Sequence, residues 1–166
     1  MAIIFLEAST SNLVDMDKGT KFKPVLTDPW GPSTDLRKIL IVSGKIYFDL
    51  IKDIQANDLH AKIRVIRLEE ICPFPFKTLA STLHDVVQSS RADQNNVVIQ
   101  YVQEEPRNQG AYGYVAQRIN PVFGALGWPN MKMEYVGRRE SEVPAVGAAV
   151  LHARDKARFM EEALRI

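Results

Sequence analysis

Short apolar runs alternate with longer amphipathic segments along this chain, and that alternation constrains the fold more than any other feature. Residues 39–42, 63–68 and 97–102 are almost continuously apolar, which is typical of strands covered on both faces. A fourth such run is centred on Tyr135. Between them, apolar residues recur at helical spacing, as at Ile46, Tyr47, Leu50, Ile51, Ile54 and again at Phe76, Leu79, Leu83, Val86, Val87. The pattern predicts an α/β fold: a three-layer, mostly parallel sheet of four or five strands with helices on both faces.

Proline and glycine suggest where the domain begins and where its loops lie. Residues 1–36 lack periodicity and contain three X-Pro pairs, so we expect an extended, partly disordered lead-in there. The domain proper is expected at residues 37–166. Within it, residues 120–131 carry two prolines and two glycines and are expected to be a loop. A closing helix is expected over residues 155–164.

Composition excludes several classes of function. Apolar residues make up 46% of the 166 positions and charged residues 25%, as in ordinary globular domains. The net charge of +1 gives no electrostatic reason to expect nucleic acid or an anionic membrane as a partner. No apolar run approaches the roughly 20 residues that cross a bilayer. The single cysteine, Cys72, excludes an internal disulfide and a cysteine-based zinc site.

Acidic side chains follow the third expected strand. Glu104 and Glu105 follow the apolar run, and Gly110 then opens an amphipathic segment over residues 111–119. In an open α/β sheet, ligands and neighbouring subunits are met at the carboxyl ends of the strands. Alternatively, either carboxylate simply interacts with the positive end of the following helix.

Six separate blocks of sequence, in the same order, carry a resemblance to a known family. They are residues 19–25, 43–50, 67–76, 102–112, 136–138 and 143–147. Together they resemble the C-terminal region of the 2-oxoglutarate dehydrogenase family, from about Gly19 to the C-terminus. Glu105-Pro106 and the block at 143–147 are more similar to the 2-oxoadipate branch.

The resemblance implies a transketolase C-terminal-domain-like fold and a role within a larger enzyme. The parent is thiamine-diphosphate- and Mg²⁺-dependent, oxidatively decarboxylates a 2-oxodicarboxylic acid and transfers the acyl group to lipoyl. Its partners would be the remainder of the parent enzyme, the homodimer mate and the lipoyl acyltransferase component, with no nucleic acid or membrane. The compartment implied is the mitochondrial matrix in a eukaryote or the cytoplasm in a bacterium.

This chain by itself is expected to hold no cofactor and to be inactive. It contains no Gly-Asp-Gly, the start of the family's metal motif, and the family's thiamine-binding regions lie upstream. It would then be a structural and regulatory domain. The alternative, favoured by Met1 and the missing upstream regions, is a free-standing ligand-binding or assembly module that kept the fold without the enzyme.

A candidate anion or effector site follows the first strand of the expected domain. Ser43, Gly44 and Lys45 open the first helix, where free N–H groups, a hydroxyl and an ammonium favour a phosphate or carboxylate. Arg67, at the end of the neighbouring strand, is expected to assist. Alternatively, the turn is only a helix start, and Glu69 or Glu70 neutralises Arg67.

Candidate interface residues lie in two segments that the family resemblance associates with subunit joining. No pair among the three histidines has metal-ligand spacing, and no metal site is expected. The aromatic residues of the C-terminal half, including Trp128 and Tyr135, belong either to an interface or to the core. The expected interface residues are Glu104, Glu105, Asn108, Gly110, Ala111, Tyr112, Tyr114, Pro144, Gly147 and His152.

Overall fold

A computed structural model describes residues 10–144 and 147–166 of the chain. Its strands, in chain order, are β1 (Val25–Thr27), β2 (Lys38–Val42), β3 (Ile63–Leu68), β4 (Val98–Pro106) and β5 (Met133–Arg138). They form one sheet in the order β1-β3-β2-β4-β5. Only β1 is antiparallel to its neighbour; the other pairs are parallel, so their carboxyl ends meet at one edge.

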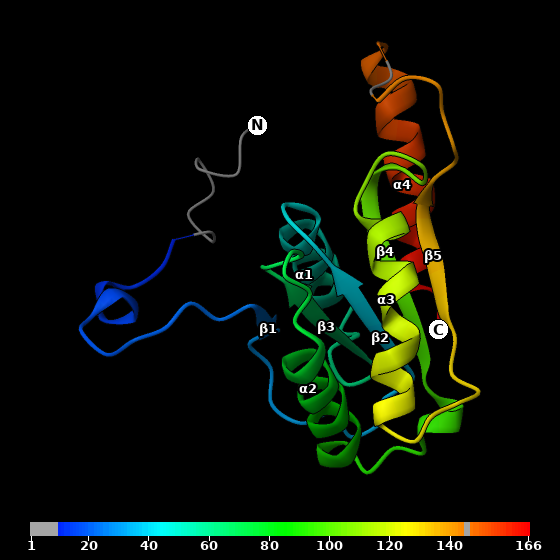
Figure 1. Ribbon diagram of the computed structural model, residues 1–166. Helices are drawn as coiled ribbons and strands as arrows, with labels where there is room; N and C mark the ends of the chain where they lie inside the picture. The colour runs from blue at the N-terminus through cyan, green and yellow to red at the C-terminus, as the bar shows by residue number, and fades with distance from the viewer. Residues whose placement is uncertain (1–9, 145–146) are drawn as a thin grey trace.

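Four α-helices cover the two faces of this sheet (Figure 1). Helices α2 (Phe76–Ser89) and α3 (Tyr112–Ala125) pack on one face, against Ile39, Ile41 and their neighbours. Helices α1 (Ile46–Ala56) and α4 (Ala149–Leu164) pack on the other, against Leu40, Val42, Val102 and Val136. All five residues of β2 are buried, as expected for a strand covered on both sides. The three-layer, transketolase C-terminal-like α/β fold is thus confirmed.

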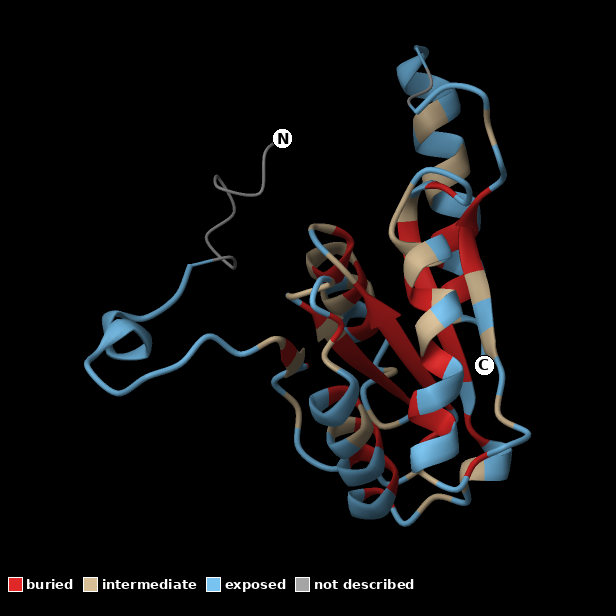
Figure 2. Ribbon diagram, viewed as in Figure 1, coloured by how far each residue is buried: buried red, intermediate tan, exposed pale blue. Residues whose placement is uncertain are grey.

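The segment expected to be a lead-in contributes a strand. Residues 10–22, which include the 3-10 helix Leu13–Met16, are exposed and lie away from the sheet (Figures 1 and 2). From Val25 onward the chain pairs with β3, and Leu36 joins the core. The expected boundary at residue 37 therefore falls after the first strand of the sheet. Residues 1–9 lie outside the described residues.

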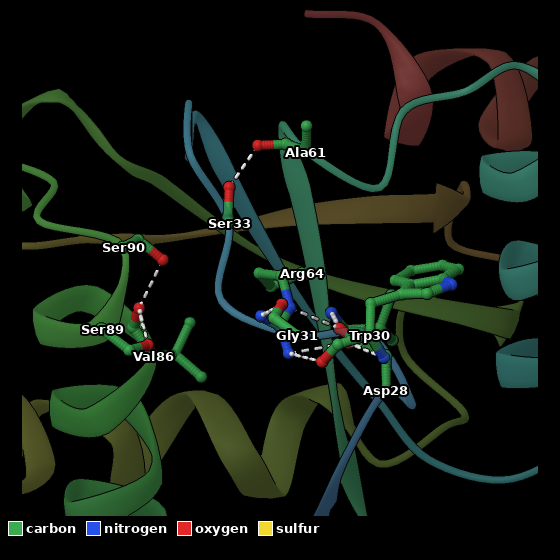
Figure 3. Close-up of polar contacts among 10 residues, drawn as sticks. Asp28, Trp30, Gly31, Ser33, Ala61, Arg64, Val86, Ser89 and Ser90 are labelled. Carbon is green, nitrogen blue, oxygen red and sulfur yellow. Dashed lines mark hydrogen bonds and ion pairs between the residues drawn. The ribbon is translucent and has the colours of Figure 1, made fainter.

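A buried ion pair fastens this early segment to β3 (Figure 3). The Asp28 carboxylate accepts hydrogen bonds from Arg64 Nε at 2.9 Å and from the Val65 amide at 2.6 Å. The side chains of Asp28 and Arg64 are 0% and 6% exposed. The guanidinium also donates to the carbonyls of Gly31 and Trp30. A buried ion pair of this kind is tolerated in the fold because each of its two charges has a counter-charge and hydrogen-bond partners.

Two helices and one strand depart from the sequence expectation. Helix α3 continues to Ala125, so the expected loop at residues 120–131 was wrong over its first half. Pro121 lies inside the helix, and the burial of Val122 and Phe123 outweighs the backbone hydrogen bond lost there. Helix α4 begins at Ala149 instead of residue 155, and β4 extends through Pro106, beyond the expected end at 102.

The last helix packs into the core through its C-terminal half. Its buried residues, Phe159, Met160 and Ala163, all lie in its C-terminal half. Lys38 Nζ, at the amino end of β2, donates to the carbonyls of Ala163 at 3.0 Å and Arg165 at 2.6 Å, and burial lowers the pKa of this lysine. The N-terminal half of α4 extends past the carboxyl ends of the strands and is largely exposed (Figures 1 and 2).

Candidate functional site

The turn after β2 places Lys45 among carboxylates. Gly44 adopts a φ of 76°, a left-handed conformation that glycine accepts without strain, and α1 begins two residues later. Lys45 Nζ lies 3.5 Å from Glu104 Oε2 and 3.6 Å from Asp49 Oδ2. An anion at this turn would have to compete with both carboxylates.

Arg67 is also paired within the chain. Its Nη2 lies 2.6 Å from Glu69 Oε1, and its Nε donates to the same oxygen at 2.7 Å. The guanidinium lies over the Tyr47 ring at 4.3 Å. The structure thus shows the pairing with Glu69 that the sequence left open as an alternative. Burial raises the pKa of Tyr47, while the Arg67 guanidinium lowers it by a smaller amount.

A chain of ionisable side chains joins three elements at the carboxyl edge of the sheet. His152 Nε2 lies 3.4 Å from Glu104 Oε1, and Lys156 Nζ lies 2.8 Å from Asp49 Oδ2. With Lys45, these groups connect α1, β4 and α4. The groups are partly exposed, so each pair stabilises the fold only modestly. Their effect is to position α4 over β4.

Gln103 holds the turn that leads into α3, and the sequence carried no signal for it. This side chain is buried; its Nε2 donates to the Pro106 carbonyl at 2.9 Å, and its Oε1 accepts from the Tyr112 amide at 2.9 Å. A Cβ added at Gly110 would overlap the Gln103 amide. Gly110 is therefore needed because the backbone passes directly against a buried, hydrogen-bonded side chain.

Asn108 connects this turn to the loop after β5. Its Nδ2 donates to the Ser141 carbonyl at 3.0 Å, and its Oδ1 accepts from the Ser141 amide at 3.1 Å. Gln109 donates to the same carbonyl at 2.7 Å. Asn108 thus makes contacts within the chain, whereas Glu105 is exposed.

The aromatic residues divide between core and surface. Trp128 is buried in the core beneath α2 and α3. Tyr112 and Tyr135 pack together with ring centroids 4.7 Å apart, and Arg107 lies over both rings. Tyr135 donates its hydroxyl proton to the Arg138 carbonyl at 2.7 Å, and burial raises its pKa to about 12. Tyr114 lies beneath the Arg118 guanidinium at 3.4 Å.

The second expected interface segment lies beside the free half of α4. Pro144 and Gly147 are exposed, and residues 145 and 146 lie outside the described residues. Val143, Val150 and Leu151 are 55%, 79% and 52% exposed, so apolar side chains do reach the surface here. Ala111, Tyr112 and Tyr114 are partly buried against the chain's own core.

Comparison with known proteins identifies the family. A sequence model described as 2-oxoglutarate dehydrogenase C-terminal matches residues 10–164. The chain belongs to this family. The matched residues include all five strands, β1 among them, and all four α-helices. The region that the family model describes is therefore the whole α/β domain.

Relatives that share this unit are much longer proteins. A 2-oxoglutarate dehydrogenase E1 component from Rickettsia felis is 34% identical over 94% of this chain, which spans 15% of that relative. A 2-oxoadipate dehydrogenase complex component E1 from Danio rerio is 28% identical over 90% of the chain, again 15% of the relative. A mitochondrial 2-oxoglutarate dehydrogenase-like protein from Rattus norvegicus is 26% identical over 94% of the chain and 15% of its own length.

Two further observations bear on the chemistry that these residues perform. Within residues 10–144 and 147–166, no group of three or more His, Cys, Asp or Glu side chains is arranged to hold a metal ion. None of the helices described is long and apolar enough to cross a membrane.

Proposed function

We propose that this chain acts as the C-terminal structural and regulatory domain of a thiamine-diphosphate-dependent 2-oxo acid dehydrogenase. The parent would oxidatively decarboxylate 2-oxoglutarate or 2-oxoadipate and transfer the acyl group to a lipoyl acyltransferase partner. The observation that carries this proposal is the family match over residues 10–164, together with E1-component relatives that cover nearly the whole chain. That breadth favours the E1 role over a free-standing module.

The domain's own contribution is proposed to be assembly. The N-terminal half of α4 extends past the sheet and carries Val150 and Leu151 at its surface, next to the loop of Pro144 and Gly147. Apolar side chains that stand together at a projecting element are typical of a surface covered by another part of an assembly. We propose that the remainder of the parent or its homodimer mate covers this surface. The compartment would follow the parent: the mitochondrial matrix or the bacterial cytoplasm.

Co-expression with an E1 polypeptide that lacks its C-terminal domain tests this role. The chain is expected to co-purify with the truncated E1 and to restore 2-oxoglutarate-dependent reduction of ferricyanide. Val150→Asp combined with Leu151→Asp should weaken the association at least about tenfold, because burying a carboxylate costs more than the 1.4 kcal/mol which that factor represents. Val98→Asp, at an exposed position at the opposite end of the sheet, serves as the matched control. Equal association of both variants would refute the assembly role of α4.

The turn at Ser43, Gly44 and Lys45 remains a proposed effector site, with Arg67 assisting. Because Glu104, Asp49 and Glu69 already pair with these cations, we expect weak binding that salt reduces further. Replacing both Lys45 and Arg67 by alanine is expected to abolish any response of the reassembled enzyme to acyl-CoA or nucleotide effectors. Basal turnover should change little. An unchanged effector response in the same ferricyanide assay would show that the turn binds no effector and serves only to begin α1.

A further inference from the structure

A groove lined by arginines lies between the end of β5, the loop at residues 139–141 and the exposed half of α4. Two adjoining cavities, of about 670 Å³ and about 470 Å³, form this arginine groove. They share Arg139, Glu140 and Arg158 in their walls. Each cavity falls within the range of volumes typical of small-molecule sites.

Positive charge exceeds negative charge in this groove. Its walls hold the cations Arg107, Arg138, Arg139, Arg154 and Arg158 and the carboxylates Glu140, Asp155 and Glu162. Arg158 pairs with Glu162 at 3.5 Å and donates to the Gly137 carbonyl at 3.0 Å. Asp155 lies 3.7 Å from Arg138.

Three of the cations, Arg107, Arg139 and Arg154, have no carboxylate partner in the described part of the chain. Arg107 lies over the rings of Tyr112 and Tyr135 instead. Neither Arg139 nor Arg154 makes an ion pair or a hydrogen bond through its guanidinium among residues 10–144 and 147–166. Both are exposed. In this respect they differ from Lys45 and Arg67 of the turn after β2, which are paired with carboxylates.

Arg138 supplies an independent indication that the groove receives a ligand. Its side chain is only 6% exposed, yet its buried Nε has no hydrogen-bond partner among the described residues. The 3.7 Å separation from Asp155 exceeds hydrogen-bonding distance. A buried donor without an acceptor costs free energy, and the side chain that carries it lines the larger cavity. A small shift of the Arg138 guanidinium toward a ligand oxygen in that cavity would satisfy this donor.

We propose that the arginine groove binds a small molecule carrying two or more phosphate or carboxylate groups. Arg138, Arg139 and Arg154 hold the acid groups, because a planar guanidinium donates paired hydrogen bonds to either kind of oxyanion. Glu140 limits how many negative charges the groove accepts, and Asp155 already takes part of the charge of Arg138. The ligand is therefore expected to carry more than one acid group but not a large negative charge.

Calorimetric titration of the full chain at low ionic strength tests the proposal with inorganic pyrophosphate and with citrate as probes. Saturable binding of at least one probe is expected, and the probe that binds more tightly identifies the acid groups that the groove prefers. Arg139→Ala combined with Arg154→Ala should weaken binding at least about tenfold, because charge-assisted hydrogen bonds are lost. Arg139→Lys combined with Arg154→Lys keeps the charge but should recover only part of the affinity.

The control removes the same charge from another surface. Lys52→Ala combined with Lys77→Ala changes two exposed lysines on α1 and α2 and should leave the affinity within about twofold, since distant exposed charges are screened. Circular dichroism verifies that every variant is folded. The proposal is overturned if neither probe shows saturable binding to the wild-type chain. It is also overturned if the lysine control weakens binding as much as the arginine pair does.

Discussion

Replacing Asp28 by alanine is expected to lower the free energy of unfolding by about 3–5 kcal/mol, because Arg64 is then buried without its counter-charge. The pair is almost fully buried, and the same carboxylate also accepts from the Val65 and Trp30 amides. Its loss should therefore release β1 from the sheet as well as weaken the domain. Urea unfolding followed by circular dichroism measures the effect.

An exposed ion pair close in the chain serves as the control. Arg37 and Asp35 lie 2.7 Å apart with side chains about half exposed, so Asp35→Ala should cost less than about 1 kcal/mol. Each substitution removes one carboxylate from an Arg–Asp pair, so the two variants differ mainly in how deeply the remaining guanidinium is buried. If Asp28→Ala costs no more than Asp35→Ala, the buried pair is not what fastens β1.

Replacing Phe159 by alanine is expected to cost about 3–5 kcal/mol, the usual effect of deleting a large buried aromatic side chain. Phe159 is fully buried in the cluster that joins α4 to Leu40, Val102 and Val136. The cavity left behind should loosen α4, and with it the wall of the arginine groove. Both the unfolding free energy and pyrophosphate affinity should fall.

Leu151→Ala is the control, because Leu151 lies on the same helix as Phe159 but is not packed in the core. Leu151 is 52% exposed, so its truncation should change the unfolding free energy by no more than about 0.5 kcal/mol. Similar losses from both substitutions would contradict the observation that α4 packs into the core through its C-terminal half.

Periodicity predicted most of this fold because most of its elements have a clear local pattern. The apolar run at residues 39–42 and the helical stripe that begins at Ile46 predicted β2 and α1 closely. Strand β1 was missed because it is three residues long and depends on Arg64, which lies 36 residues beyond Asp28. Pro121 likewise suggested a loop. The backbone hydrogen bond that a proline removes from a helix can be foreseen from the sequence, but the tertiary packing that compensates for it cannot.

The sequence indicated which strand ends lie together more clearly than which side chains pair there. The carboxyl edge of the sheet does bring Lys45 and Glu104 together, as the order of the strands implies. Which carboxylate pairs with which cation depends on side-chain geometry that spacing does not encode. The arginine groove was missed for the same reason, because Arg139 and Arg154 become neighbours only when α4 packs beside β5.

The position of α4 also limits the order in which the nascent chain can fold. One face of the sheet is closed by α1 and α4 together, and α4 follows every strand of the sheet in the chain. Among the residues that the structure describes, Lys38 near the start of the sheet has its acceptors only at Ala163, in the final turn of that helix, and at Arg165. Until then Val102, Val136 and their neighbours face solvent, so the newly made sheet presents an apolar surface to chaperones until synthesis has passed residue 165.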